Sequence, residues 1–230
     1  RLARSCKTIK NVGWDEQSES QQCIAERDVG VRVAHPNLRA MSDPKTGMPD
    51  RYVYKMFHID TNRINARGGL ENMNQLERWH RDSVIRLEMS EPSLGEAFQG
   101  NSSARKSKAA EYIYSITYAD TAEEQAALRR IEQILFPEGA KDQNQKNDVK
   151  VVFNARKYQR ILVTNDGGSK SQPGGILGNA EQLRRELGVS VVTDTQAVEI
   201  VRKAIQKRDE MARYVSKNRA VPLPDWVGKD

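Results

Sequence analysis

The chain has 230 residues, a formal net charge of +6 and a pI near 9.3, and 37% of its residues are hydrophobic and 30% charged. This composition favours one modest core with solvated helices over a large sandwich, as one domain with an extension or two small domains. The excess of Lys and Arg is compatible with a polyanionic partner, and equally with a protein that is merely basic.

The remaining bulk features argue against a secreted or membrane protein. Two cysteines, Cys6 and Cys23, provide neither a disulfide framework nor a zinc-ligand pattern. No stretch approaches the roughly 18 to 20 apolar residues that cross a bilayer, and the N-terminal region lacks an apolar signal-peptide core. We therefore expect a cytoplasmic protein with no membrane partner.

The chain divides into three parts by composition. Residues 1–52 are polar and rich in turn formers, and they show no sustained helical period. They are expected to form an extension, either a strand or hairpin packed on the domain or a partly disordered arm. The domain itself is expected at 53–218 and a C-terminal tail at 219–230.

Within the domain, short apolar runs predict strands, and apolar residues spaced three or four apart predict helices. The strands are expected at 54–59, 84–87, 161–163 and 189–192. The helices are expected at 70–80, 92–98, 109–118, 122–136, from 148 onward, 176–187 and 195–215, with a flexible basic break at 100–108 and a Gly-rich loop at 167–175. Because strands alternate with helices, the predicted fold class is α/β, a three-layer α/β/α arrangement around a mainly parallel sheet.

Acidic residues stand where the strands of this sheet end. Asp60 directly follows the apolar run YKMFHI, and Asp166 directly follows ILVTN. Asp148 is expected in the first turn of the helix that leads into the ILV strand, so that helix and strand return Asp148 and Asp166 to the same edge. Because ligands bind parallel α/β sheets at the carboxyl ends of the strands, this edge is the candidate functional site.

A fourth acid, Glu96, is expected about one turn into the helix after the second strand, with Glu88 and Glu91 as alternatives. Carboxylates that converge repel one another unless cations neutralise them. Oxygen ligands of this kind favour Mg²⁺ or Mn²⁺, which are therefore the expected cofactors.

Each acid also has a purely structural interpretation. Asp60 and Asp148 could cap the helices that follow them, and Asp166 could open the Gly-rich loop as an Asx-turn residue. Asp194 is expected to be the N-cap of the last helix, although it stands at the correct edge for a fifth ligand. His58 is expected to be a packed core residue.

Four segments in order, HIDTN (58–62), SLGEAF (93–98), NDVKVVFNARKY (147–158) and ILVTNDGG (161–168), resemble the four acidic motifs of PIN-domain metal-dependent nucleases. This family of ribonucleases includes the toxins of many bacterial toxin–antitoxin pairs. The resemblance covers roughly residues 54–195 and implies a PIN-like nuclease domain with a helical insertion around 100–147. PIN domains commonly place Thr or Ser two residues before the last acid, as Thr164 stands here.

The resemblance implies an Mg²⁺- or Mn²⁺-dependent endoribonuclease in which a metal-activated water attacks the RNA phosphodiester, and it allows a toxin role. Its catalytic and metal-binding residues would be Asp60, Glu96, Asp148 and Asp166, supported by Asn62, Thr164 and Asn165. Weaker candidates for contacts to the nucleic acid are Arg63, Arg67, Arg105, Lys106, Lys108 and Lys170. RNA is the expected partner, with DNA, an antitoxin or other protein, and a second copy of the chain left open.

Two other functions also fit the sequence. One is a PIN-like scaffold that has lost catalysis and binds nucleic acid or protein, in which the four carboxylates need not come within metal-bridging reach. The other is an unrelated α/β enzyme such as a phosphatase. Phosphatases of that kind usually carry a DxD pattern after the first strand, where this chain has Asp60-Thr61-Asn62.

Overall fold

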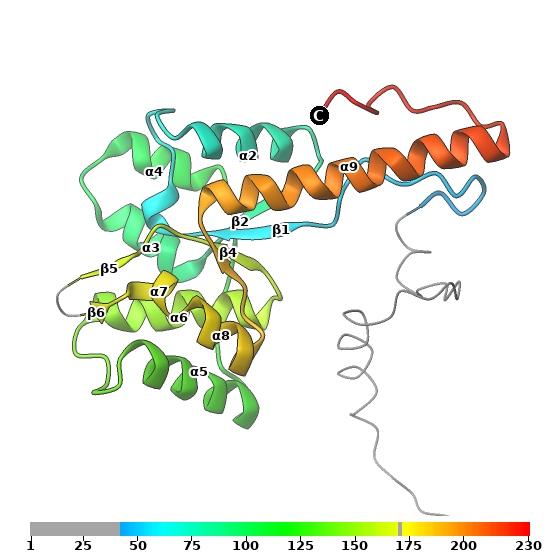
Figure 1. Cartoon of the computed structure of the whole chain (residues 1–230). Coiled ribbons are helices and arrows are strands. Elements are labelled where there is room, and N and C mark those ends of the chain that lie inside the picture. The colour runs from blue at the N-terminus through cyan, green and yellow to red at the C-terminus, as the bar shows by residue number, and fades with distance from the viewer. Residues whose placement is uncertain (1–41, 170–171) are drawn as a thin grey trace, which may run out of the picture. The chain divides into compact units, whose positions relative to one another are not determined.

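The computed structural model describes residues 42–169 and 172–230. Cys6, Cys23, Lys170 and most of the expected N-terminal extension therefore lie outside the described residues. The described residues form a central parallel sheet with helices on both faces (Figure 1), which confirms the α/β fold class expected from the sequence. None of the helices in the described part of the chain is long and apolar enough to cross a bilayer.

The central sheet has five strands in the order β3-β2-β1-β4-β7, and every neighbouring pair is parallel. Its strands are β1 (Met56–Ile59), β2 (Arg86–Ser90), β3 (Ile113–Ser115), β4 (Ile161–Val163) and β7 (Val191–Val192). Strand β1 lies in the middle, where Phe57 is paired with Leu87 on one side and with Ile161 on the other. A second, antiparallel pair joins β5 (Gly168–Ser169) to β6 (Gln172–Pro173).

Helices cover the two faces of this sheet (Figure 1). On one face lie α2 (Glu71–Arg81) and the long α9 (Asp194–Arg219). On the other lie α5 (Ala122–Leu135), α6 (Gln143–Lys157) and α8 (Ala180–Leu187). The short elements are the 3-10 turn η2 (Thr61–Arg63), α3 (Glu91–Gln99), α4 (Ser103–Ala110) and α7 (Gly175–Gly178).

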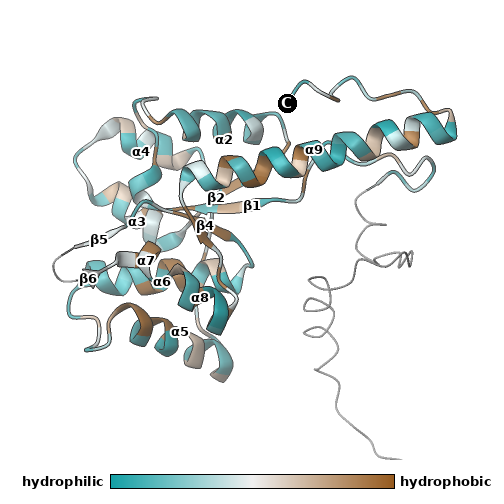
Figure 2. Ribbon diagram, in the orientation of Figure 1, coloured by the Kyte–Doolittle hydropathy of each residue, from teal (hydrophilic) through white to brown (hydrophobic). Residues whose placement is uncertain are grey.

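Each face of the sheet has its own apolar core, because successive strand residues point to opposite faces. Phe57 of β1 belongs to the core under α2 and α9, together with Leu76 and Val201. Leu162 of β4 belongs to the core under α5 and α6, together with Phe153. Figure 2 shows the same division, with apolar residues on the strands and on the inner sides of helices whose outer sides are hydrophilic.

Local sequence explains where several helices begin. Thr121 and Glu124 form a reciprocal capping box at the start of α5, and Thr193 and Gln196 form another at the start of α9. The sequence prediction that Asp194 caps the last helix was therefore wrong by one residue. Asp194 is the first residue of α9, where its negative charge suits the positive end of the helix dipole.

The structure corrects the prediction for residues 100–118. The basic stretch expected to be a flexible break forms α4, whose N-cap Ser102 accepts a hydrogen bond from the backbone of Arg105. Its Ala, Arg and Lys residues are good helix formers. The helix expected at 109–118 is absent, and edge strand β3 takes its place, because β-branched and aromatic residues such as Ile113 and Tyr114 fit a sheet better.

Helix α6 begins earlier than expected. It starts at Gln143, and its N-cap is Asp142, whose side chain accepts a hydrogen bond from the backbone N–H of Gln145. Asp148 therefore lies in the second turn and not the first, and the interpretation of Asp148 as an N-cap was wrong. Its carboxylate is consequently not engaged in capping.

Segments on either side of the domain pack against the second half of α9. Met48 is buried with Ala212 and Val215, and Val221, Trp226 and Val227 pack against this cluster. The guanidinium of Arg208 is 4.3 Å from the ring centre of Trp226. Residues 42–50 and the region expected to be a tail thus contribute to one small core.

Candidate metal centre

Asp60 lies at the carboxyl end of β1 and is held from several sides. Its carboxylate accepts hydrogen bonds from the Thr61 backbone N–H at 2.6 Å, from Asn62 Nδ2 at 2.6 Å and from Thr164 Oγ1 at 2.6 Å. The first of these bonds caps η2, so the interpretation of Asp60 as a capping residue is correct. The third bond ties Asp60 to Thr164, the residue that follows β4, which a capping role does not require.

Asp166 is fixed by the turn that follows β4. Its two carboxylate oxygens accept from the backbone N–H groups of Ile176, at 2.8 Å, and Gly168, at 3.2 Å. The bond to Gly168 is the Asx-turn contact that the sequence suggested. Gly175 makes this possible, because its φ is +54° and an added Cβ would lie 2.6 Å from the Asp166 carboxylate.

Glu96, on α3, faces the same region. One of its carboxylate oxygens accepts from Thr61 Oγ1 and the other from Asn147 Nδ2, both at 2.8 Å. The two alternatives lie elsewhere: Glu88 forms ion pairs with Arg86 and Arg160, and Glu91 accepts from the backbone of Thr117. The contacts to Thr61 and Asn147, which are next in sequence to Asp60 and Asp148, favour Glu96 as the fourth acid.

Asp148 differs from the other three acids because its carboxylate has no hydrogen-bond or ion-pair partner among residues 42–169 and 172–230. Burial, together with the charges of Asp60, Asp166 and Glu96, raises the pKa of Asp148 to about 7. The second turn of α6 therefore brings Asp148 within electrostatic range of the other three acids.

Asp60 shows the same effect. Burial raises the pKa of Asp60 to about 6, with the hydrogen bonds from Thr164 and Thr61 opposing the rise and the charges of Glu96 and Asp166 adding to it. The structure thus brings two acids from α3 and α6 and two from the turns after β1 and β4 into one electrostatic environment at the carboxyl edge of the sheet.

The four carboxylates do not converge on a single point. Within the described ranges, no three Asp, Glu, His or Cys side chains lie close enough together to hold a metal ion. Hydrogen bonds explain the separation for two of the acids, because Glu96 is turned toward Thr61 and Asn147, and Asp166 toward the backbone of Ile176. Side-chain rotation at these two positions is required before the site could hold a metal ion.

The chemistry of the available donors fits a hard divalent cation. Carboxylates are supplemented by the Asn62 amide and the Thr164 hydroxyl, which lie 3.0 Å apart, and the Asn62 side-chain oxygen accepts from the Asn165 backbone. Such an oxygen-rich set suits Mg²⁺ or Mn²⁺ better than the softer metals that prefer Cys or His.

Some of the basic residues that were candidates for nucleic-acid contacts are already paired, and others are not. Arg63 pairs with Asp194 at 3.2 Å, Lys108 pairs with Glu77 and Glu111, and Arg105 donates to the backbone carbonyl of Thr61. Arg67 is exposed and Lys106 is half-buried, and neither forms an ion pair within the described part of the chain. The run 105–108 therefore does not present three free cations.

Two polar residues of this site were not identified from the sequence. Thr61 and Asn147 orient Glu96, yet a single Thr or Asn next to an acid carries no periodic or spacing signal. Only the fold, which places α3 beside α6 and η2, reveals their role.

Comparison with known proteins adds little. No protein-family model and no curated protein matches the sequence. Among solved structures, the chain is similar to one in the crystal structure of VapBC2 from Rickettsia felis bound to a DNA fragment from their promoter, with 13% sequence identity, a TM-score of 0.39, and coverage of 60% of this chain and 98% of that chain. A similarity at this level carries no functional argument, so the function must be argued from the site.

Proposed function

We propose that this protein is an endoribonuclease that uses Mg²⁺ or Mn²⁺ to hydrolyse RNA phosphodiester bonds. The observation that carries the proposal is the joint position of Asp60, Glu96, Asp148 and Asp166, which lie on α3, on α6 and in the turns after β1 and β4 and influence one another electrostatically. The resemblance of the surrounding segments to the acidic motifs of PIN nucleases supports the same function, and it extends the proposal to a toxin role with an antitoxin partner.

The four acids would hold the cation, and the chain would orient them. Thr61, Asn62 and Thr164 hold Asp60 in place, whereas Asp166 would have to give up its bond from the backbone of Ile176 to turn toward a cation. Glu96 can exchange its bonds to Thr61 and Asn147 for a cation, and Asp148 has no bond to give up. A bound divalent cation would supply activation of the attacking water and neutralisation of charge on the phosphoryl group.

A second candidate function is a catalytically inactive module that binds nucleic acid or protein. The observation that favours it is the absence, within the described residues, of three acids at metal-ligating distance. The two candidates differ in one measurable respect: the nuclease gains a divalent cation and cleaves RNA, whereas the scaffold binds without cleaving.

The test is cleavage of a fluorescent single-stranded RNA by the full chain in Mn²⁺. We expect Asp166→Asn to reduce the rate to about one hundredth of wild type or less, because removing one carboxylate weakens cation binding and charge neutralisation. Glu199→Gln is a matched control, since Glu199 is an exposed acid on α9 without a partner among the described residues.

Two results would overturn the nuclease proposal. One is equal cleavage by wild type and Asp166→Asn, which would indicate a contaminating nuclease. The other is RNA binding by wild type with no cleavage in either Mg²⁺ or Mn²⁺, which would favour the scaffold. Circular dichroism of each variant checks that the fold is intact.

A further inference from the structure

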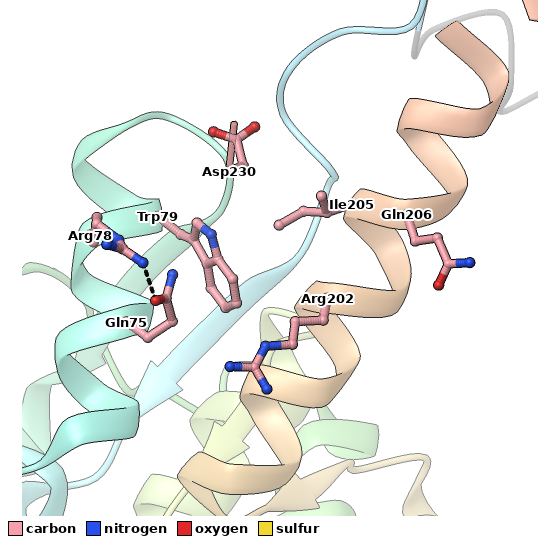
Figure 3. A pocket seen from close by; sticks show the side chains of 7 residues that line it. All are labelled: Gln75, Arg78, Trp79, Arg202, Ile205, Gln206 and Asp230. Carbon is pink, nitrogen blue, oxygen red and sulfur yellow. Dashed lines mark hydrogen bonds between the residues drawn. The ribbon is translucent and has the colours of Figure 1, made fainter. Parts of the chain in front are cut away.

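A groove between α2 and α9 contains polar groups that the candidate metal centre does not use (Figure 3). One part of it has a volume of about 410 Å³, and an adjoining part of about 450 Å³ shares three of its residues, Gln75, Arg78 and Arg202. The lining is polar along most of its length, with Ile205 and Trp79 as its main apolar contributors.

Trp79 is one of the residues that line this groove. The residue is only 3% exposed, and its Nε1 is buried from solvent without a hydrogen-bond partner among the described residues, so the N–H is not open to the groove. Figure 3 shows the indole standing between α2 and α9, beside Arg78 and Ile205.

The free charges in the groove are mainly positive. Arg202 and Arg81 have no ion-pair partner within the described part of the chain, and Arg78 contacts only the neutral Gln75. The acids are largely occupied: Glu77 is bonded to Lys108 and Tyr112, and Asp230 to Arg51 and Arg208. Glu71 is the one lining acid without a partner among the described residues, so three guanidinium groups face a single free carboxylate.

The groove begins near the metal centre. The N-terminal turns of α2 and α9 are joined by a hydrogen bond of 2.9 Å from Asn72 Nδ2 to Thr195 Oγ1. The neighbouring Asp194 pairs with Arg63, which adjoins Asn62 of the site. Eight residues separate Asp194 from Arg202, which is roughly 12 Å along the helix axis.

We propose that this groove binds the phosphate backbone of single-stranded nucleic acid, with Arg78 and Arg202 as donors. The proposal rests on the proposed function, because the bound strand would be the substrate whose other end reaches the metal centre. Guanidinium groups suit phosphate, which they bind in a bidentate manner. The direction of the groove toward the acids favours nucleic acid over an acidic peptide.

The experiment measures binding of a short fluorescein-labelled oligouridine to the full chain in EDTA, by fluorescence anisotropy over a range of salt concentrations. We expect Arg202→Ala to weaken binding roughly tenfold. It should also reduce the slope of log K against log salt by about 0.7, the contribution of one phosphate contact to a single strand.

Lys203→Ala is the matched control, because Lys203 is the adjacent cation on α9 and does not line the groove. It should change neither the affinity nor the slope as much as Arg202→Ala does.

If Arg202→Ala and Lys203→Ala changed oligouridine binding equally, the proposal that the groove binds nucleic acid would be wrong. It would also be wrong if wild type bound no oligouridine. Tighter binding of poly-glutamate than of oligouridine would assign the groove to an acidic polypeptide and also overturn the proposal. Because binding in EDTA requires no cleavage, failure of the groove proposal in this experiment would not contradict the nuclease proposal. Normal groove binding with no cleavage would reject the nuclease proposal alone.

Discussion

At the scale of single residues, the candidate site is a set of charges that destabilise one another. Asp148 shows this most clearly, because its carboxylate is half-buried and without a partner among the described residues, and its pKa is raised to about 7. A raised pKa means that the folded state binds the proton more tightly than the unfolded state does. The folded protein is therefore destabilised as the pH rises from about 4 toward 7.

We accordingly predict that Asp148→Asn stabilises the metal-free protein at neutral pH. The gain should be about 1 to 2 kcal/mol, after allowance for the partial exposure of Asp148. The difference between variant and wild type should shrink as the pH falls below the ordinary pKa of 3.8, where the Asp148 carboxyl is protonated in both states. Urea denaturation in EDTA at several pH values measures the change.

In added Mn²⁺, wild type should become more stable than Asp148→Asn. The reason is that a cation that binds only the folded state stabilises that state more when it binds more tightly. Wild type should then gain more stability than Asp148→Asn. A destabilised variant in EDTA, or equal Mn²⁺ shifts in the two proteins, would refute the prediction. Asp60→Asn is less informative here, since it also disturbs the bonds from Thr61, Asn62 and Thr164.

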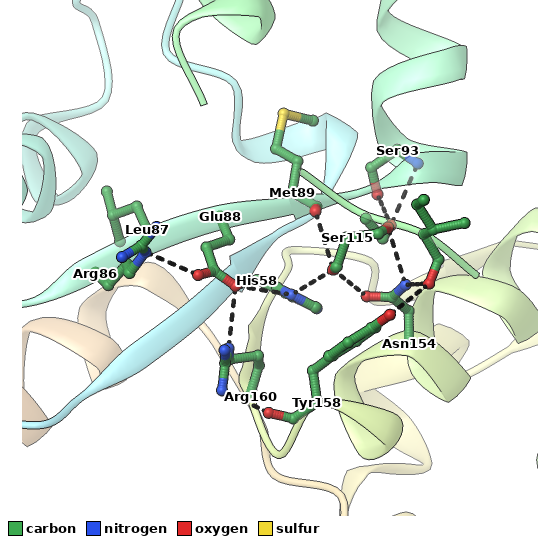
Figure 4. A network of polar contacts seen from close by, with 12 residues as sticks. His58, Arg86, Leu87, Glu88, Met89, Ser93, Ser115, Asn154, Tyr158 and Arg160 are labelled. Atoms are coloured by element: carbon green, nitrogen blue, oxygen red, sulfur yellow. Dashed lines mark hydrogen bonds and ion pairs between the residues drawn. The ribbon is translucent and has the colours of Figure 1, made fainter. Parts of the chain in front are cut away.

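At the scale of elements, a buried polar network joins the strands beneath the core (Figure 4). Glu88 of β2 lies 3.6 Å from His58 Nε2 on β1 and accepts from Arg160 Nε, just before β4, at 3.0 Å. Ser115 of β3 lies 3.1 Å from His58 and donates to Asn154 of α6. Four neighbouring elements of the sheet are thus linked through Glu88 and His58, which confirms that His58 is a packed core residue.

Contacts to His58 and Arg160 hold the pKa of Glu88 down to about 2. Its contribution to stability is therefore present above its ordinary pKa and is lost as the pH falls toward 2. Burial, by contrast, lowers the pKa of His58 despite its contact with Glu88, so the histidine is neutral at pH 7. The charge pairs in this network are therefore Glu88 with Arg160 and with the more exposed Arg86.

We predict that Glu88→Gln destabilises the protein by about 3 kcal/mol at pH 7, because it leaves Arg160 without its buried counter-charge. Glu123→Gln serves as the comparison, since Glu123 pairs with Arg156 on the surface and its side chain is 82% exposed. That substitution should have little effect. Equal stability of the two variants by urea denaturation at pH 7 would show that the network is not a stabilising link.

At the scale of the whole molecule, α9 joins the domain to the segments that flank it. Its first half packs against α2 and the sheet, and its second half carries the small core around Met48, Ala212 and Val215. Arg208, which is buried, donates to the Arg51 carbonyl and to Asp230 while lying over the ring of Trp226. One side chain therefore connects residues on both sides of the domain.

We predict that Trp226→Ala lowers the free energy of unfolding by about 1 to 2 kcal/mol, through loss of the cation–π contact and of apolar packing. Residues 221–230 should become accessible to limited proteolysis while the rest of the domain stays resistant. Leu223→Ala is the control, because Leu223 is 46% exposed. Unchanged protease resistance of Trp226→Ala would mean that the segment is held by other contacts.

Much of the architecture followed from local pattern alone. Buried strands such as 161–163 are short apolar runs, and long helices such as α5 and α9 have both a capping residue and an apolar period, so chain order alone indicated a parallel α/β sheet. The same order placed Asp60 and Asp166 at the carboxyl edge of that sheet, since Asp60 directly follows β1 and Asp166 lies three residues beyond the end of β4. These inferences succeeded because the interactions behind them are between near neighbours in sequence.

Other features depended on contacts between distant residues. Strand β3 could not be told from a helix until β2 was there to pair with it. Likewise, Thr61 and Asn147 meet Glu96 only because η2, α3 and α6 pack together, and the groove exists only where α2 lies beside α9. Tertiary packing decided these points, because a contact across the fold leaves no periodic trace in the sequence of either partner.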